Sequence, residues 1–300
     1  MRRPRSGRRR LAAAAALAAL AVTAGCGDPP KEPQSGGPGA TFDSALHERL
    51  PDEIRRDGVL RVSTDASYAP ASFFAPDGRT VVGFEADLLA ELARVLGVEV
   101  EMVITDFGKA LDEVEAHRVD VVVSAMTDTL DREQHADFVN YFSAGTSVVV
   151  QRGNPTGIAD LADLCGKVVA VETGTVHVDL LARSQGRCSR DPIEVREHRT
   201  NADALVELRT GRAAAVLNDY PPAAYLVSDE RTRGDYQLAS NVQYEPGLYG
   251  IAVARDRTRL RDALQAGLER LLATGAYERV LSDWDVEDGA LDTIGVNAGG

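Results

Sequence analysis

Two short stretches of the sequence place polar groups where α/β proteins bind ligands. Gly174-Thr175-Val176 comes directly before a predicted helix, and the unpaired N–H groups at the start of a helix attract an anion. Asp219 stands at the end of a predicted strand, where it either meets a cationic ligand group or caps the next helix, which Pro221 can open. Because ligands of open α/β sheets gather at strand ends, both stretches predict a binding site.

The same region offers an acid and a base but no catalytic motif. Glu172 and His177 flank the Gly-Thr turn. No nucleophile elbow, pair of catalytic carboxylates or phosphate-binding loop accompanies them in the sequence. We therefore do not expect an enzyme, and we expect no cofactor.

Metal ions and nucleic acids are not expected as partners. The histidines show no ligand spacing with one another or with the cysteines, and we expect them to be surface or structural residues. They are His47, His117, His135, His177 and His198. The sequence has no polybasic face and no interleaving of basic and aromatic residues, so nothing in it points to nucleic acid.

The N-terminus predicts export and lipidation. Six arginines lie among the first ten residues, and an apolar run at 11–22 follows them. This run is shorter than the ~20 residues of a membrane-spanning helix and is typical of a signal peptide. The residues before Cys26 resemble the lipobox of bacterial lipoproteins, in which the cysteine is acylated and becomes the new N-terminus. We predict a lipoprotein signal peptide at 1–25; the alternative is ordinary signal cleavage.

Cleavage before Cys26 would leave an acidic chain on a tether. It removes six arginines and no acid, so the net charge of −13 becomes −19. Residues 26–41 are rich in proline and glycine, which predicts a flexible tether. Cys165 and Cys188 then remain as an even pair in an oxidising compartment, and we expect a disulfide; the alternative is two buried free thiols.

From residue 58 onward the hydrophobic pattern alternates between strands and helices. Strands are predicted at 59–62, 98–104, 119–123, 167–171, 213–217 and 249–253, and helices at 84–96, 107–117, 177–184, around 205–208, after 221, at 260–272 and at 277–284. Parallel strands need crossover connections, so this order predicts an α/β fold with covering helices. We expect residues 286–300, which contain Gly and Asp, to be frayed.

Four stretches resemble one known family, the extracytoplasmic amino-acid-binding proteins of ABC importers. They are residues 58–68, residues 83–88, DVVVSAMTDTLDR from Asp120 to Arg132, and GRAAAVLND from Gly211 to Asp219. Their order and spacing match the polar amino acid group of solute-binding protein family 3 over residues 58–285. The resemblance implies a type II periplasmic-binding fold: two α/β lobes, each a mixed or parallel sheet covered by helices, with the ligand cleft between them.

The resemblance also implies where each lobe begins and ends. Lobe 1 would be discontinuous and comprise residues 42–148 and 246–285, and lobe 2 would comprise residues 149–245. Residues 286–300 would form a C-terminal tail. The two crossovers between the lobes would lie near 147–151 and 242–247.

The family's clamps for a free amino acid map onto both lobes. Arg132 would grip the ligand carboxylate bidentately, and Thr127 and the backbone of Ala125 would add a hydroxyl and a carbonyl. Thr175 and the backbone N–H of Val176 would face the same carboxylate from lobe 2. Asp219 would meet the ammonium. The alternatives are a surface arginine in a turn and a helix-capping aspartate.

Three further residues would surround the ligand's side chain. Tyr68 and Phe107 occupy the positions of the family's aromatic walls; the alternative is core packing. Asp65 aligns with the residue that reaches the side-chain tip in binders of cationic and amide amino acids. Ala71 changes one pocket wall, and Glu85 is either a support of the site or structural. The expected ligands are arginine, lysine or ornithine, followed by glutamine or histidine.

The implied function is capture and delivery of an amino acid. The chain would be a monomeric lipoprotein on the outer face of the cell membrane. Closure of its lobes on the ligand would precede delivery to an ABC permease and its ATPase. The alternatives are a ligand-sensing subunit of a membrane receptor and a dehydratase on the same fold.

Overall fold

The computed structural model describes residues 40–299. The predicted signal peptide, Cys26 and nearly all of the predicted tether lie outside these residues. None of the helices between residues 40 and 299 has the length and hydropathy of a bilayer-spanning segment.

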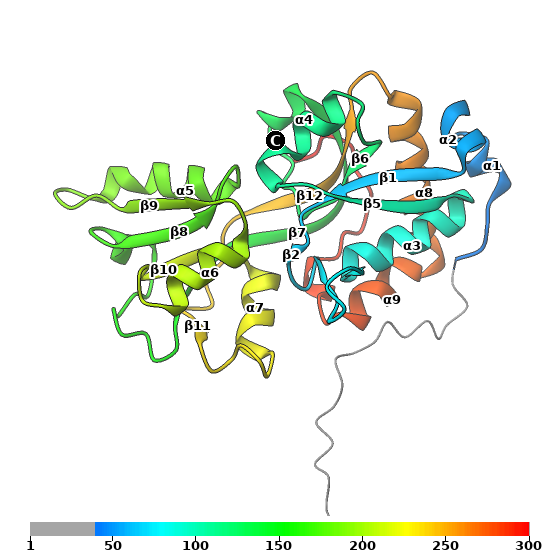
Figure 1. Cartoon of the computed structure of the whole chain (residues 1–300). Coiled ribbons are helices and arrows are strands. Elements are labelled where there is room, and N and C mark those ends of the chain that lie inside the picture. Colours follow the sequence, from blue (N-terminus) through cyan, green and yellow to red (C-terminus); the bar gives the residue numbers. More distant parts are fainter. Residues whose placement is uncertain (1–39, 300) are drawn as a thin grey trace, which may run out of the picture. The chain divides into compact units, whose positions relative to one another are not determined.

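The first group of elements, which we call lobe 1, builds one end of a sheet (Figure 1). Its strands in the main sheet are β1 (Val59–Thr64), β5 (Glu99–Ile104) and β6 (Val121–Val122). Its helices are α1 (Ser44–His47), α2 (Asp52–Asp57), α3 (Phe84–Leu96), η1 (Phe107–Lys109), α4 (Ala110–Glu115), η2 (Arg132–Gln134), α8 (Thr258–Thr274), α9 (Ala276–Asp283) and η5 (Glu287–Gly289). A separate small sheet contains β2 (Ser67–Tyr68), β3 (Ser72–Phe74) and β4 (Val81–Val82).

The second group, lobe 2, builds the other end of the same sheet. Its strands are β8 (Val168–Glu172), β9 (Glu194–His198), β10 (Ala215–Asp219) and β11 (Tyr236–Leu238). Its helices are η3 (Leu161–Leu164), α5 (Val176–Ser184), η4 (Gln185–Arg187), α6 (Asn201–Arg209) and α7 (Tyr220–Ser228). Cys165 and Cys188, which follow η3 and η4, form the predicted disulfide.

Two long antiparallel strands join the lobes: β7 (Ala136–Gln151) and β12 (Tyr244–Ala254). The strand order is β5-β1-β6-β12-β7-β10-β8-β9, with β11 paired to β7. Within each lobe the shorter strands are parallel to one another and antiparallel to β7 or β12, so the sheet is mixed, as predicted. The register of β7 and β12 shifts between Tyr244 and Gly247, where Glu245 has φ of +46°.

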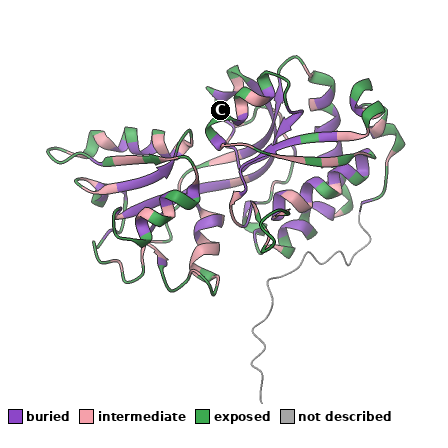
Figure 2. Cartoon of the chain, in the orientation of Figure 1, coloured by how far each residue is buried: buried purple, intermediate pink, exposed green. Residues whose placement is uncertain are grey.

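Apolar clusters lie on both faces of the sheet in each lobe, and Figure 2 shows many buried residues along its central strands. In lobe 2, Val148 and Val150 of β7 pack towards α5, whereas Val149 packs towards α6 and α7. In lobe 1, α3, α8 and α9 cover one face and α4 covers the other. Strands that are buried on both faces read as apolar runs, which is why 119–123 and 167–171 stand out in the sequence.

The prediction that residues 286–300 are frayed is wrong for the described part of this segment. Ile294 is buried, and Val296 forms a bridge with Val139 of β7. The N–H of Asn140 donates to the carbonyl of Gly295 at 3.0 Å, and the N–H of Phe138 donates to the side chain of Asn297. The segment therefore covers an edge of β7 that would otherwise expose unpaired backbone groups.

This contact makes stability depend on the tail. We expect Ile294→Ala to lower the free energy of unfolding by about 2–4 kcal/mol, because it leaves a cavity beneath the tail. Thr293→Ala, at an exposed neighbouring position, is the matched control and should leave the free energy within about 0.5 kcal/mol. Denaturant unfolding measures both; equal stability of the two variants would contradict the packed tail.

Candidate ligand-binding site

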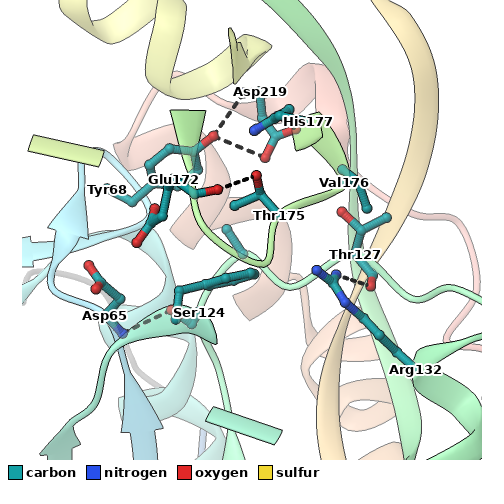
Figure 3. A pocket seen from close by; sticks show the side chains of 12 residues that line it. Asp65, Tyr68, Ser124, Thr127, Arg132, Glu172, Thr175, Val176, His177 and Asp219 are labelled. Atoms are coloured by element: carbon teal, nitrogen blue, oxygen red, sulfur yellow. Dashed lines mark hydrogen bonds and ion pairs between the residues drawn. The ribbon is translucent and has the colours of Figure 1, made fainter. Parts of the chain in front are cut away.

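A hollow between the lobes gathers every residue that the sequence assigns to ligand binding. These are Asp65, Tyr68, Phe107, Ala125, Thr127, Arg132, Thr175, Val176 and Asp219, and the structure adds Ser124, Glu172 and His177 to the lining (Figure 3). The hollow encloses about 340 Å³ of space without protein atoms, part of it open to solvent.

Both lobes contribute the ends of parallel strands. In lobe 1, Asp65 follows β1 directly and Ser124 follows β6. In lobe 2, Glu172 is the last residue of β8 and Asp219 is the last residue of β10. The sequence rule that places ligands at strand ends therefore applies to both walls of the hollow.

Arg132 is a buried cation whose described hydrogen bonds go to carbonyl groups. It is 9% exposed, and its Nη1 and Nη2 donate to the carbonyls of Thr127 at 2.6 Å and Gly174 at 2.8 Å. The guanidinium carbon lies 5.4 Å from the centre of the Phe107 ring. Burial lowers the pKa of Arg132 to about 10. A cation buried against neutral groups is stabilised by an incoming anion.

Across the hollow, Arg132 donates to the carbonyl of Gly174, a position that strongly favours glycine. Gly174 has φ of +79°, and a Cβ atom there would stand 3.0 Å from the Cα of Gly108 in lobe 1. The backbones of the two lobes thus touch beside the start of α5. Gly174-Thr175-Val176 does precede a helix, as predicted, and the hydroxyl of Thr175 donates to the carbonyl of Glu172.

Asp219 receives donors from both lobes. The hydroxyl of Tyr68 in lobe 1 donates to Asp219 Oδ2 at 3.1 Å and accepts the N–H of Asp219 at 2.8 Å. His177 Nε2 lies 3.3 Å from Asp219 Oδ1. Burial and the charge of Asp219 hold the pKa of Tyr68 well above its usual range. Asp219 does not cap α7 with its side chain, so the capping alternative fails.

Two further carboxylates face the hollow away from Arg132. Asp65 is 7% exposed and Glu172 is 6% exposed, and Figure 3 shows their carboxylates pointing into the same part of the hollow from opposite lobes. Asp65 Oδ1 accepts the N–H of Ser67 at 2.9 Å. Burial, together with the charge of Asp65, raises the pKa of Glu172 to about 9, and burial also raises the pKa of Asp65. The site thus has a cationic side and an acidic side.

Glu85 supports the lobe 1 wall from behind. Its carboxylate accepts the N–H of Ala125 at 2.6 Å and the hydroxyls of Ser72 and Tyr141. Ala125 has φ of +47°, a conformation that a residue with a side chain adopts only when its surroundings hold it. Burial raises the pKa of Glu85. Glu85 therefore fixes the backbone that turns Ala125 into the hollow.

Some expectations for this region are wrong. Ala71 does not form a pocket wall: it is not among the residues that line the hollow and is buried in the core of lobe 1. The sequence marks Glu172 and His177 only as an acid and a base beside the Gly-Thr turn and gives neither a role in ligand binding. Both line the hollow, and His177 is 3% exposed there. No residue spacing marks a single histidine that meets its partner only through the fold, whereas Glu172 ends a strand as Asp219 does.

Metal coordination finds no support among the described residues. No group of three His, Cys, Asp or Glu side chains between residues 40 and 299 lies close enough together to hold an ion.

Comparisons with known proteins point to one family. Residues 60–287 match the family described as bacterial extracellular solute-binding proteins, family 3. The arginine-binding protein of Corynebacterium glutamicum is 29% identical over 256 residues, which cover 84% of this chain and 82% of that protein. The L-cystine-binding protein of Escherichia coli strain K12 is 27% identical over 248 residues, 82% of this chain and 90% of that protein.

A solved structure shows the same fold. It is an ancestral amino acid-binding protein described as a precursor of cyclohexadienyl dehydratase. It superposes with a TM-score of 0.69 at 30% identity and covers 78% of this chain and 98% of that one.

The Tyr68 hydroxyl offers a test of the contact between the lobes. Tyr68→Phe removes two interlobe hydrogen bonds, each worth about 0.5–1.5 kcal/mol net, and keeps the ring. We expect the ligand-free variant to be more open and to show a larger radius of gyration in small-angle X-ray scattering. Tyr225→Phe, whose hydroxyl binds Arg231 within lobe 2, is the control. An unchanged radius in Tyr68→Phe would contradict the role of the hydroxyl.

Proposed function

The chain belongs to family 3 of the bacterial extracellular solute-binding proteins, and we propose that it binds one amino acid between its lobes and delivers it to an ABC importer. The observation that carries this proposal is that a buried cation, Arg132, and a buried acid, Asp219, line the same hollow from different lobes. Arg132 is buried among carbonyl groups on one side of the hollow, and Asp219 is buried on the other lobe. A free amino acid carries a carboxylate for the first and an ammonium for the second.

The remaining lining supports both charged groups of an amino acid. Thr127 would offer its hydroxyl and Ala125 its carbonyl, and Thr175 and Val176 would present the start of α5 to the carboxylate. Val176 has no hydroxyl, so only its backbone N–H would donate. Tyr68 and Phe107 would enclose the ligand's side chain, and Phe107 already packs against the guanidinium of Arg132.

Closure of the lobes would act as the capture step. Contacts between the lobes include the hydrogen bonds from Arg132 to Gly174 and from Tyr68 to Asp219 and an ion pair of 2.8 Å between Arg199 and Asp106. The lobes are connected covalently by β7 and β12. The register of the two strands shifts where residues 144–147 of β7 lie beside residues 244–247 of β12, and we call this part the crossover segment. We infer that the backbone torsions of this segment change when the hollow opens and closes.

The acidic side of the hollow favours a cationic or polar side chain. Asp65 would meet the side-chain tip, so arginine, lysine and ornithine are the first candidates and glutamine or histidine the next. The name of the Corynebacterium glutamicum relative supports arginine. The name of the Escherichia coli relative shows that similar chains serve a different amino acid.

A dehydratase is the second candidate, because Glu172 would be a protonated acid in the hollow at neutral pH. It is supported by the description of the ancestral protein as a dehydratase precursor. The relatives named above are binding proteins, which supports the binding function. Recovery of a bound ligand unchanged after incubation, measured by mass spectrometry, would exclude the dehydratase.

A thermal-shift screen tests the binding function. We expect one or more of the twenty amino acids, ornithine or citrulline to raise the melting temperature, since ligand at a hundredfold excess over Kd stabilises by about 2.7 kcal/mol. Arg132→Ala and Asp219→Ala should each abolish the shift, and Arg79→Ala, at an exposed turn, should retain it. Circular dichroism establishes that the variants are folded. A retained shift in either clamp variant would disprove the clamp.

The lipid anchor needs its own test, because Cys26 lies outside the described residues. We propose that Cys26 carries the lipid and that the tether at 26–41 holds the protein at the outer face of the membrane. Cys26→Ala should move the protein from the membrane fraction to the soluble fraction of an expressing bacterium and stop incorporation of labelled palmitate. Membrane retention of the variant would contradict lipidation.

A further inference from the structure

Glu172 is a buried acid that the proposed amino-acid clamp leaves unused. It ends β8 in lobe 2, lines the hollow and is 6% exposed. Its Oε1 has no hydrogen-bond partner among the described residues. A buried carboxylate oxygen without a partner costs free energy, so it needs either a proton or a cation.

The described charges that act most strongly on Glu172 are acids, and none of them is a cation that could form an ion pair with it. Asp65 faces it from lobe 1, and the acids Asp106 and Asp203 add negative charge. Arg199, whose charge acts on Asp65, is exposed and ion-paired with Asp106 at 2.8 Å. The acidic side of the hollow therefore has more carboxylates than cations.

We propose that Glu172 and Asp65, one from each lobe, jointly bind a guanidinium or ammonium at the end of the ligand's side chain. This inference rests on the proposed function and narrows it to amino acids with a cationic side chain. Because the two carboxylates belong to different lobes, the side-chain cation bridges the lobes, as the ligand's backbone groups do between Arg132 and Asp219. A neutral side chain of the same shape would leave Asp65 without a counter-charge and Glu172 protonated.

The pair also couples binding to a proton. With a pKa of about 9, Glu172 is protonated in the ligand-free protein at neutral pH. A cation favours the ionised form, so binding transfers the carboxyl proton to solvent and leaves a carboxylate paired with the cation. Affinity for a cationic ligand therefore rises with pH up to about 9.

Several other ionisable groups surround this acid from the elements packed around it. They are Asp65 after β1, Asp106 before η1, Tyr68 in β2, His177 in α5, His198 in β9, Arg199 before α6, Asp203 in α6 and Asp219 in β10. A measured proton release is assigned to Glu172 only if it disappears in a variant that cannot ionise there.

The test compares arginine with citrulline, its neutral isostere, in wild type and Glu172→Gln. We expect Glu172→Gln to weaken arginine about tenfold or more and citrulline less than threefold, since a charge-assisted hydrogen bond is lost only for arginine. Glu197→Gln, an exposed position on the neighbouring strand β9, is the matched control and should change neither affinity. Isothermal titration calorimetry measures all six affinities.

Titrations in buffers of different ionisation enthalpy count the protons. At pH 7.5, wild type should release up to one proton per arginine, and this release should vanish with citrulline and in Glu172→Gln. An unchanged ratio of arginine to citrulline affinity in Glu172→Gln overturns this inference and leaves the proposed function intact. If wild type binds arginine no better than citrulline, the inference is also wrong. If wild type binds no amino acid, the proposed function and the inference fail together.

The ligand-free protein gives a second readout that needs no binding. A carboxyl whose pKa is raised on folding stabilises fully below its ordinary value near 4.5, and this stabilisation is lost as pH rises through about 9. Glu172→Gln should therefore flatten the fall of melting temperature between these two pH values. An identical slope in wild type and variant would contradict the buried, protonated acid.

Discussion

The structure depends on charges that are buried between two lobes without full compensation inside the protein. Arg132 has carbonyl partners, Asp65 feels the charge of the exposed Arg199, and Glu172 is held protonated at neutral pH by burial and by the neighbouring acids. Such groups cost free energy in the absence of ligand, and that cost is recovered only by a molecule with the opposite charges in the same order. This need for matching charges restricts the class of ligand more strongly than any single contact does.

The two lobes could move apart, and these charges with them, while the apolar core of each lobe stays intact. The apolar clusters of lobe 1 and lobe 2 share β7 and β12 but few other elements. The alternation of Val148, Val149 and Val150 between the two faces anchors β7 firmly in lobe 2. A change of backbone torsion where β7 and β12 shift register would therefore move whole lobes, because each core is close-packed and resists deformation.

Much of the fold could be predicted from the sequence. The helix at Phe84–Leu96 shows apolar residues at four-residue spacing and ends at Gly97, which has φ of +68°. The family and the mixed α/β fold inferred from four short stretches are confirmed by the match over residues 60–287 and by the observed sheet. The strands of the small sheet, β2 to β4, have two or three residues each and are too short to show a period. The polar composition of the tail predicts fraying, but Ile294 and Val296, together with backbone hydrogen bonds to β7, hold it against that strand.

Site residues that stand in a family motif could be predicted from the sequence. Residues outside these motifs could not be assigned to the ligand. Glu172 and His177 are adjacent to the turn that the sequence marks, but their partners Asp65 and Asp219 are distant along the chain. Only the fold shows that Tyr68 and His177 both reach Asp219, the residue to which an ammonium would bind. Both groups hold the acid in place, and the hydroxyl of Tyr68 also joins the two lobes. If the lobes close on a ligand as proposed, the ligand shifts that equilibrium only by the interactions it adds in the closed form, and Arg132 and Glu172, which form no ion pair among the described residues, would supply the strongest of them.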